Sequence, residues 1–198
     1  MISSRLKLYF VISLVGSIAI ALIGYVYTAR DLPPYPGKVV SESGAVLTGK
    51  DRIMSGQGLW QRYGLMDVGS VWGHGTYRGP DFSAQSLHLV GQTMRAKLAV
   101  EKFGKPYAEL ATDEKGSVDA TVVSQIKGNR YQAATDVLTL SPLQEAALID
   151  LRAFYAELFT HGDDKGPIRP NTIKNADDIR DLADFFFWTS WCAGTVRP

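Results

Sequence analysis

The chain has few of the residues that build disulfides and metal sites. Its 198 residues include one cysteine, Cys192, and three histidines. A single thiol excludes an internal disulfide and any metal site built on paired cysteines, so we expect Cys192 to be a small apolar residue of a helix. Because no two of the histidines are four residues apart, the two-histidine helical metal site is excluded as well.

Signatures of catalysis and of nucleic-acid binding are also missing. The sequence contains no Gly-x-Ser-x-Gly elbow, no phosphate-binding glycine loop and no Glu-x-x-His. We therefore expect no catalytic residue within this chain. The formal net charge is +1 and the basic residues are scattered, which leaves no basic face for nucleic acid as a partner.

Charged residues are absent from Leu8 to Ala29, a run long enough to cross a hydrocarbon core of about 30 Å as a helix. Arg5 and Lys7 precede this run, which favours a cytoplasmic N-terminus and an extracytoplasmic body. A cleaved signal peptide is the alternative, but two interfacial tyrosines and the lack of a small-residue cleavage site favour an anchor. We expect residues 1–30 to lie in the lipid bilayer and the proline-rich residues 31–47 to form a juxtamembrane linker.

The rest of the chain provides enough apolar residues for one compact domain. We expect a mainly α domain over residues 48–180, with long irregular connections. Residues 64–80 are rich in glycine and predict a loop, and residues 106–139 predict an insertion with a short helix or hairpin. Caps and helical spacing predict four helices, which begin after Thr48, at Ser83, at Ser141-Pro142 and at Asn175; the second ends near Phe103-Gly104 and the third at His161-Gly162.

The last predicted helix carries an unusual aromatic run, Phe185-Phe186-Phe187-Trp188-Thr189-Ser190-Trp191. Aromatic residues on every side of an exposed helix favour aggregation or contact with a membrane. We therefore expect residues 181–198 to be the start of a further membrane-entering segment in a longer chain. The alternative is a core helix of a complete protein.

Several uncommon motifs occur in a fixed order along the chain. After the anchor come Gly56-Gln57-Gly58-Leu59-Trp60, then Val68-Gly69-Ser70-Val71-Trp72-Gly73-His74-Gly75-Thr76-Tyr77, then Pro80-Asp81-Phe82-Ser83-Ala84, and finally the aromatic run with Arg197-Pro198. This order resembles the N-terminal region of quinol-dependent nitric oxide reductase. The resemblance implies one transmembrane helix followed by an extracytoplasmic (periplasmic) cytochrome c-like domain without haem, in a bacterial or archaeal plasma membrane.

Covalent haem can be tested directly on the residues. Attachment of c-type haem needs Cys-x-x-Cys-His. When the chain is anchored on Gly75 and Tyr77, the resemblance places that motif on five consecutive residues, none of which is cysteine or histidine: Leu65, Met66, Asp67, Val68 and Gly69. Covalent attachment is therefore excluded. Met66 or His74 could ligate a non-covalent haem, but we expect them to serve packing or hydrogen bonding.

The resemblance also implies a role for the segment Gly75-Thr76-Tyr77. In related two-subunit enzymes the carbonyl groups of a matching segment help to hold calcium, a hard cation that accepts backbone oxygens. Gly75 and Tyr77 would then be partial metal ligands, with the other ligands outside this chain. The alternative is that the glycines serve turns with positive φ and that the aromatic residues only pack.

For the parent enzyme, the resemblance implies reduction of two nitric oxide molecules to nitrous oxide and water. Electrons would come from membrane quinol and pass through haem b to a haem b and non-haem iron pair, whose ligands lie on later helices. This chain would then be a structural cap on a haem-copper-oxidase-like catalytic bundle. We expect the docking residues to be aromatic: Trp72, Tyr77, Phe186, Trp188 and Trp191.

Two other classes of protein remain open from the residues alone. One is a stand-alone anchored assembly or binding module with a degenerate cytochrome c fold. The other is an anchored electron carrier, which requires non-covalent haem because the attachment motif is missing.

Overall fold

The computed structural model describes residues 3–30, 32–163 and 166–196, and the chain divides into two compact units, residues 1–34 and 35–198. The first unit contains helix α1 (Ser4–Arg30), which is long and apolar enough between Ser4 and Ala29 to cross a membrane. Its apolar side chains are exposed in the chain by itself. This helix fits the membrane anchor expected at residues 1–30. Asp31, at the start of the expected linker, and Arg197 and Pro198, at the end of the last motif, lie outside the described residues.

The second unit contains a small sheet that the sequence analysis did not predict. Its strands are β1 (Lys38–Ser41), β2 (Val46–Thr48), β5 (Tyr131–Gln132) and β6 (Val137–Leu140), in the order β2-β1-β6-β5. Strand β1 runs antiparallel to β2 and parallel to β6, with Val39 opposite Leu138. Residues 38–48 are therefore part of the folded unit, although we expected most of them in a linker. Strands of two to four residues are too short to show the alternation that identifies a strand.

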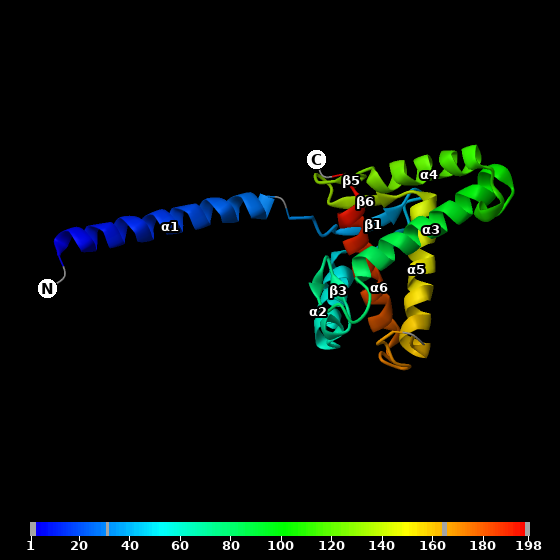
Figure 1. Cartoon of the computed structure of the whole chain (residues 1–198). Helices are drawn as coiled ribbons and strands as arrows, with labels where there is room; N and C mark the ends of the chain where they lie inside the picture. Colours follow the sequence, from blue (N-terminus) through cyan, green and yellow to red (C-terminus); the bar gives the residue numbers. More distant parts are fainter. Residues whose placement is uncertain (1–2, 31, 164–165, 197–198) are drawn as a thin grey trace. The chain divides into compact units, whose positions relative to one another are not determined.

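The described part of the second unit also contains five α-helices: α2 (Lys50–Arg62), α3 (Phe82–Phe103), α4 (Thr112–Lys127), α5 (Pro142–His161) and α6 (Ala176–Gly194). Helix α6 contacts α2, α3 and α5 and lies among them (Figure 1). It approaches α2 closely because Gly56 has no side chain. A Cβ at Gly56 would collide with the Asp181 carbonyl oxygen and lie 2.7 Å from the Phe185 Cβ.

Two of the predicted helix starts are confirmed. Ser141 and Gln144 form a reciprocal capping box, in which the Gln144 N–H donates to Ser141 Oγ (3.3 Å) and the Ser141 N–H donates to Gln144 Oε1 (3.0 Å). Asn175 caps α6 by accepting the Asp177 N–H at 2.9 Å. The predicted helix end at Gly104 is also found, with φ of 65°.

Two predicted caps are wrong. Thr48 does not cap α2, because the N-cap residue is Gly49 and the Thr48 hydroxyl donates to Asp184 Oδ2 at 2.6 Å. Ser83 lies inside α3, which Asp81 caps by accepting the Ala84 N–H at 2.9 Å. Each hydroxyl group instead bonds to another part of the fold: that of Thr48 to Asp184 of α6, and that of Ser83 to the backbone N–H of Trp72.

For residues 106–139 we expected a short helix or a hairpin, and the structure has a long helix followed by a hairpin. Helix α4 has sixteen residues and buries Val118 and Val122, and β5 and β6 follow it as a hairpin. Glu114 accepts the Ala111 N–H at 2.9 Å at the start of α4. The segment is thus a regular part of the fold and packs on α3.

The aromatic run lies in the interior of the second unit. Every residue from Leu182 to Cys192 is buried. The Phe186 ring stacks on Phe82 with centroids 4.6 Å apart and lies 4.9 Å from the Tyr155 ring. Because residues 182–192 of α6 are buried on every side of the helix, its aromatic residues need no membrane to bury them. The structure thus corresponds to the core-helix alternative for the aromatic run.

Candidate functional site

The loop between α2 and α3 contains residues 65–69, Trp72, Gly75 and Tyr77, which were selected from the sequence. A 3-10 turn, η1 (Leu65–Asp67), is followed by strands β3 (Ser70–Val71) and β4 (His74–Gly75), which pair antiparallel. We call residues 70–77 the docking hairpin, because Trp72 and Tyr77 are two of the residues for which docking was expected from the sequence. Its central residues, Trp72 and Gly73, have φ of 52° and 76°, as two-residue hairpin turns require. A bulky residue such as tryptophan rarely adopts positive φ, so other contacts must hold it there.

Three hydrogen bonds join the turn to residues outside the hairpin. The Trp72 N–H donates to Ser83 Oγ (3.2 Å), the Trp72 Nε1–H donates to the Thr189 carbonyl (3.0 Å), and the Gly73 N–H donates to Asp81 Oδ2 (2.7 Å). The Trp72 ring also lies 5.5 Å from the Trp188 ring. The turn is therefore tied to both α3 and α6, while 44% of the Trp72 surface stays exposed.

Asp81 is the acceptor at the centre of this arrangement. Besides the Gly73 N–H and the Ala84 N–H, its carboxylate accepts the Ser70 hydroxyl at 2.7 Å. Partial burial raises the pKa of Asp81, but the hydrogen bonds from Gly73, Ala84 and Ser70 lower it by more, so its pKa lies below the ordinary value of 3.8. The carboxylate is thus the ionised anchor of both the turn and the start of α3.

The segment Gly75-Thr76-Tyr77 continues the docking hairpin at the surface. Gly75 has φ of 140°, and a Cβ there would collide with the Gly69 carbonyl oxygen, so only glycine fits. The Thr76 N–H donates to the carbonyl groups of Met66 (3.0 Å) and Gly69 (3.2 Å). Tyr77 is 90% exposed.

The same segment can be compared with the expected calcium site. Between Gly75 and Tyr77, the buried Thr76 hydroxyl has no hydrogen-bond partner among the described residues. Hydroxyl and carbonyl oxygens are the kind of ligand that a hard cation such as calcium accepts. Within the described ranges, no group of three or more His, Cys, Asp or Glu residues could hold a metal ion.

The five positions of the haem-attachment motif are the three residues of η1 and the two residues that follow it. Leu65 is buried, whereas Met66 is 40% exposed. At Gly69, where the motif has its histidine, a Cβ would collide with the Pro80 carbonyl oxygen and lie 3.0 Å from the Phe82 ring. Phe82 in turn stacks on Phe186. A side chain at position 69 would therefore require the backbone and the aromatic core to shift.

The structure separates the five expected docking residues into two groups. Trp72 and Tyr77 are exposed on the docking hairpin, next to the exposed Met66. Phe186, Trp188 and Trp191 are buried in the second unit, so we correct the expectation that they form a docking surface. Sequence reasoning missed the role of Asp81 and assigned Ser83 as the cap instead, although an aspartate directly before a helical run is a known cap signal.

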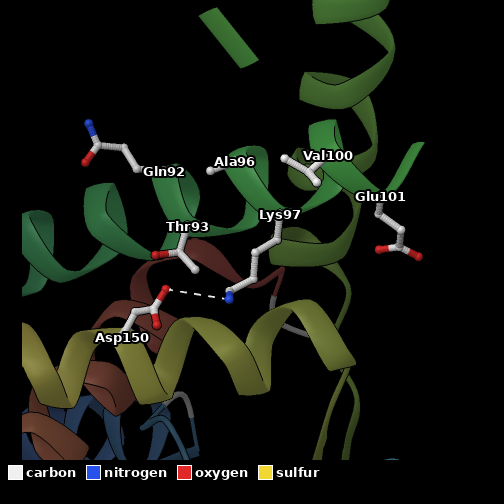
Figure 2. Close-up of a pocket in the computed structure, with 7 residues that line it drawn as sticks. All are labelled: Gln92, Thr93, Ala96, Lys97, Val100, Glu101 and Asp150. Carbon is white, nitrogen blue, oxygen red and sulfur yellow. Dashed lines mark ion pairs between the residues drawn. The ribbon is translucent and has the colours of Figure 1, made fainter. Parts of the chain in front are cut away.

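A second surface feature lies between α3 and α5. This open depression is lined by α3 residues together with Asp150 of α5, and Figure 2 shows Thr93 and Lys97 pointing toward Asp150. The Lys97 Nζ and Asp150 Oδ2 are 4.0 Å apart. The depression does not include any of the residues that were selected from the sequence.

Comparison with family models assigns residues 36–198 to a cytochrome c-like domain. The matching family is the NorB cytochrome c-like domain of nitric oxide reductase, and because the match covers most of the chain, the chain belongs to this family. The matched range begins one residue after the start of the second unit at Tyr35. A search of curated proteins found no match.

Proposed function

We propose that this chain is the anchored, haem-free cap of a quinol-dependent nitric oxide reductase. In this proposal α1 lies in the plasma membrane with its N-terminus in the cytoplasm, and the second unit lies on the extracytoplasmic side. There it covers and stabilises the catalytic membrane bundle of the same protein. Membership of the NorB family of nitric oxide reductase domains supports the assignment to this enzyme, and the apolar helix α1 supports the anchor.

The main support for a structural role is the exposure of the docking hairpin. Within the described residues of the second unit, Trp72 and Tyr77 are the exposed aromatic side chains, while the other aromatic residues are buried or half-buried. Exposed aromatic residues beside an apolar Met66 are typical of interface anchors. His74 and Arg78 are exposed on the same segment and would suit an acidic partner surface.

In this proposal, the catalytic membrane bundle and not this chain would hold the haem groups. Residues 65–69 supply no cysteine or histidine, and the core next to Gly69 is occupied by Phe82. Haem b and non-haem iron would be held by the catalytic bundle, which receives electrons from membrane quinol and reduces two nitric oxide molecules to nitrous oxide and water. The part played by this chain would be structural.

Calcium would strengthen the same interface. The Gly75 and Tyr77 carbonyl groups and the Thr76 hydroxyl would supply some of its six to eight oxygen ligands. When bound, the ion would join the docking hairpin to acidic groups of the partner. Tyr77 is fully accessible for such a contact.

Chemical labelling tests the docking directly. The single native thiol, Cys192, is buried, so Tyr77→Cys introduces one accessible thiol into this chain. We expect a maleimide reagent to label Tyr77→Cys rapidly in the separate 198-residue chain and at least tenfold more slowly in the whole enzyme, because the interface excludes the reagent. Val100→Cys, on the exposed side of α3, is the control and should label alike in both. Equal labelling of Tyr77→Cys in both proteins would instead favour a stand-alone binding module.

A further inference from the structure

The turn that presents Trp72 depends on side chains that do not belong to the docking hairpin. We infer that Asp81 and Ser83 are positioning residues, which hold Trp72 in its docking conformation before the partner is met. This inference rests on the proposed function, because it concerns the same docking surface. It adds a requirement that docking alone does not imply: Asp81 and Ser83 must fix the conformation of the hairpin before binding. We call these two contacts the lock.

The backbone at Trp72 shows why a lock is needed. Positive φ is unfavourable for a residue with a large side chain, and an isolated two-stranded hairpin is marginally stable at best. Strands β3 and β4 contribute two residues each, so their pairing cannot fix the turn alone. The hydrogen bonds to Ser83 Oγ and Asp81 Oδ2 supply the missing support at the two turn residues.

The two positioning residues also fix the direction of the turn. Asp81 caps α3 and Ser83 lies in its first turn, so the turn is joined to the end of a helix of 22 residues. On the opposite side the Trp72 indole is bound to the Thr189 carbonyl of the buried helix α6. The exposed face of Trp72 is therefore held by rigid elements. A pre-organised aromatic anchor loses less conformational entropy on binding than a mobile one.

A purely structural role for these residues is the competing explanation. Asp81 could serve only as the cap of α3, and Ser83 could serve only to fill space in the core. Both roles would change global stability without a specific effect on the turn. The two explanations therefore differ in their predicted effect: a positioning role predicts a local loss of order at Trp72 and Gly73, whereas a structural role predicts only a lower global stability.

Ser83→Ala tests the lock with little damage to α3, because alanine is the best helix former. Ser86→Ala is a matched control: it removes a buried hydroxyl from the same helix, but that hydroxyl bonds to Tyr155 and not to the docking hairpin. In hydrogen exchange of the full chain in nanodiscs, we expect Ser83→Ala to speed exchange at Trp72 and Gly73 by about fivefold or more, the factor of one net hydrogen bond. Ser86→Ala should leave these two amides unchanged, and Asp81→Asn should act like Ser83→Ala.

Docking is measured on the same variants by labelling Tyr77→Cys in the whole enzyme. We expect Ser83→Ala to raise the labelling rate several-fold and Ser86→Ala to leave it unchanged. The inference is overturned if exchange at the turn is unaffected by both Ser83→Ala and Asp81→Asn, or if the turn loosens while labelling stays slow. If Tyr77→Cys is already labelled rapidly with Ser83 and Asp81 in place, the proposed docking itself fails, and the inference fails with it even where the exchange results show a lock.

Discussion

Arg152 and Asp184 form a two-point ion pair inside the second unit. Arg152 Nε donates to Asp184 Oδ1 at 2.6 Å and Arg152 Nη2 donates to Asp184 Oδ2 at 2.9 Å. The Asp184 side chain is fully buried, and the Thr48 hydroxyl donates to it as well. Because Arg152 also donates to the Leu47 carbonyl, this cluster joins α5, α6 and β2.

Removal of the arginine should strongly destabilise the fold. Arg152→Met leaves a buried carboxylate without its counter-charge, and such changes cost about 3–5 kcal/mol. The free energy of unfolding, measured by urea denaturation of the full chain in detergent, should fall by that amount. Arg95→Met is the control, because the Arg95–Asp119 pair is partly exposed and such pairs contribute about 0–1 kcal/mol. Equal losses for the two variants would contradict this account of the core.

Two glycines of α2, two residues apart, should respond oppositely to alanine. Gly56→Ala places a methyl group against the Asp181 carbonyl and the Phe185 Cβ, so it should destabilise the contact between α2 and α6 by about 1–3 kcal/mol. Gly58→Ala meets open space on the exposed side of the helix and should stabilise the chain by up to about 1 kcal/mol. Thermal unfolding followed by circular dichroism measures both, and a stabilising Gly56→Ala would show that the two helices are less close than described.

The signals that predicted parts of the fold are local in the sequence. The Ser141–Gln144 box, the Asn175 cap and the Gly104 helix end depend on neighbouring residues, and all three were predicted. The pairing of β1 with β6 was missed because Val39 pairs with Leu138, about a hundred residues away in the chain. Thr48 and Ser83 were assigned as caps because their distant partners, Asp184 and the Trp72 backbone, cannot be seen locally.

The aromatic run shows a different limit. A helix that is apolar on all sides can be a membrane span or the centre of a domain, and composition does not distinguish the two. The placement of α6 among α2, α3 and α5 depends on tertiary packing. For the candidate site, Trp72, Gly75 and Tyr77 could be selected from the sequence, but the role of Asp81 required the folded turn.

The docking hairpin should be sensitive to acid through Asp81. Its folded-state pKa lies below 3.8, so its contribution to stability is complete above the unfolded pKa and is lost as the pH falls through the folded value. The difference in unfolding free energy between the native chain and Asp81→Asn should therefore be constant above about pH 5 and shrink below about pH 4. Urea denaturation at a series of pH values measures this difference. A difference that does not vary between about pH 6 and about pH 3 would contradict the ionised role of Asp81.

Substitution of Gly75 should reduce calcium binding in the whole enzyme. Gly75→Ala cannot keep φ of 140° beside the Gly69 carbonyl, so it displaces the Gly75 and Tyr77 carbonyl groups. We expect the bound calcium per enzyme, measured by mass spectrometry of the metal content, to fall by more than half. Gly58→Ala is the control and should leave the metal content unchanged. Full calcium content in Gly75→Ala would show that this segment does not supply ligands.

The most direct test of the central claim is the activity of the protein that carries this chain. The protein is purified from native membranes through a tag on the N-terminal side of α1, and nitric oxide consumption is measured with a quinol as the electron donor. The account predicts that haem b and non-haem iron purify with the tag and that one nitrous oxide forms for two nitric oxide molecules consumed, at a rate that depends on the quinol. Purification of the chain without haem b, or with no nitric oxide consumption above the quinol-free control, would contradict it.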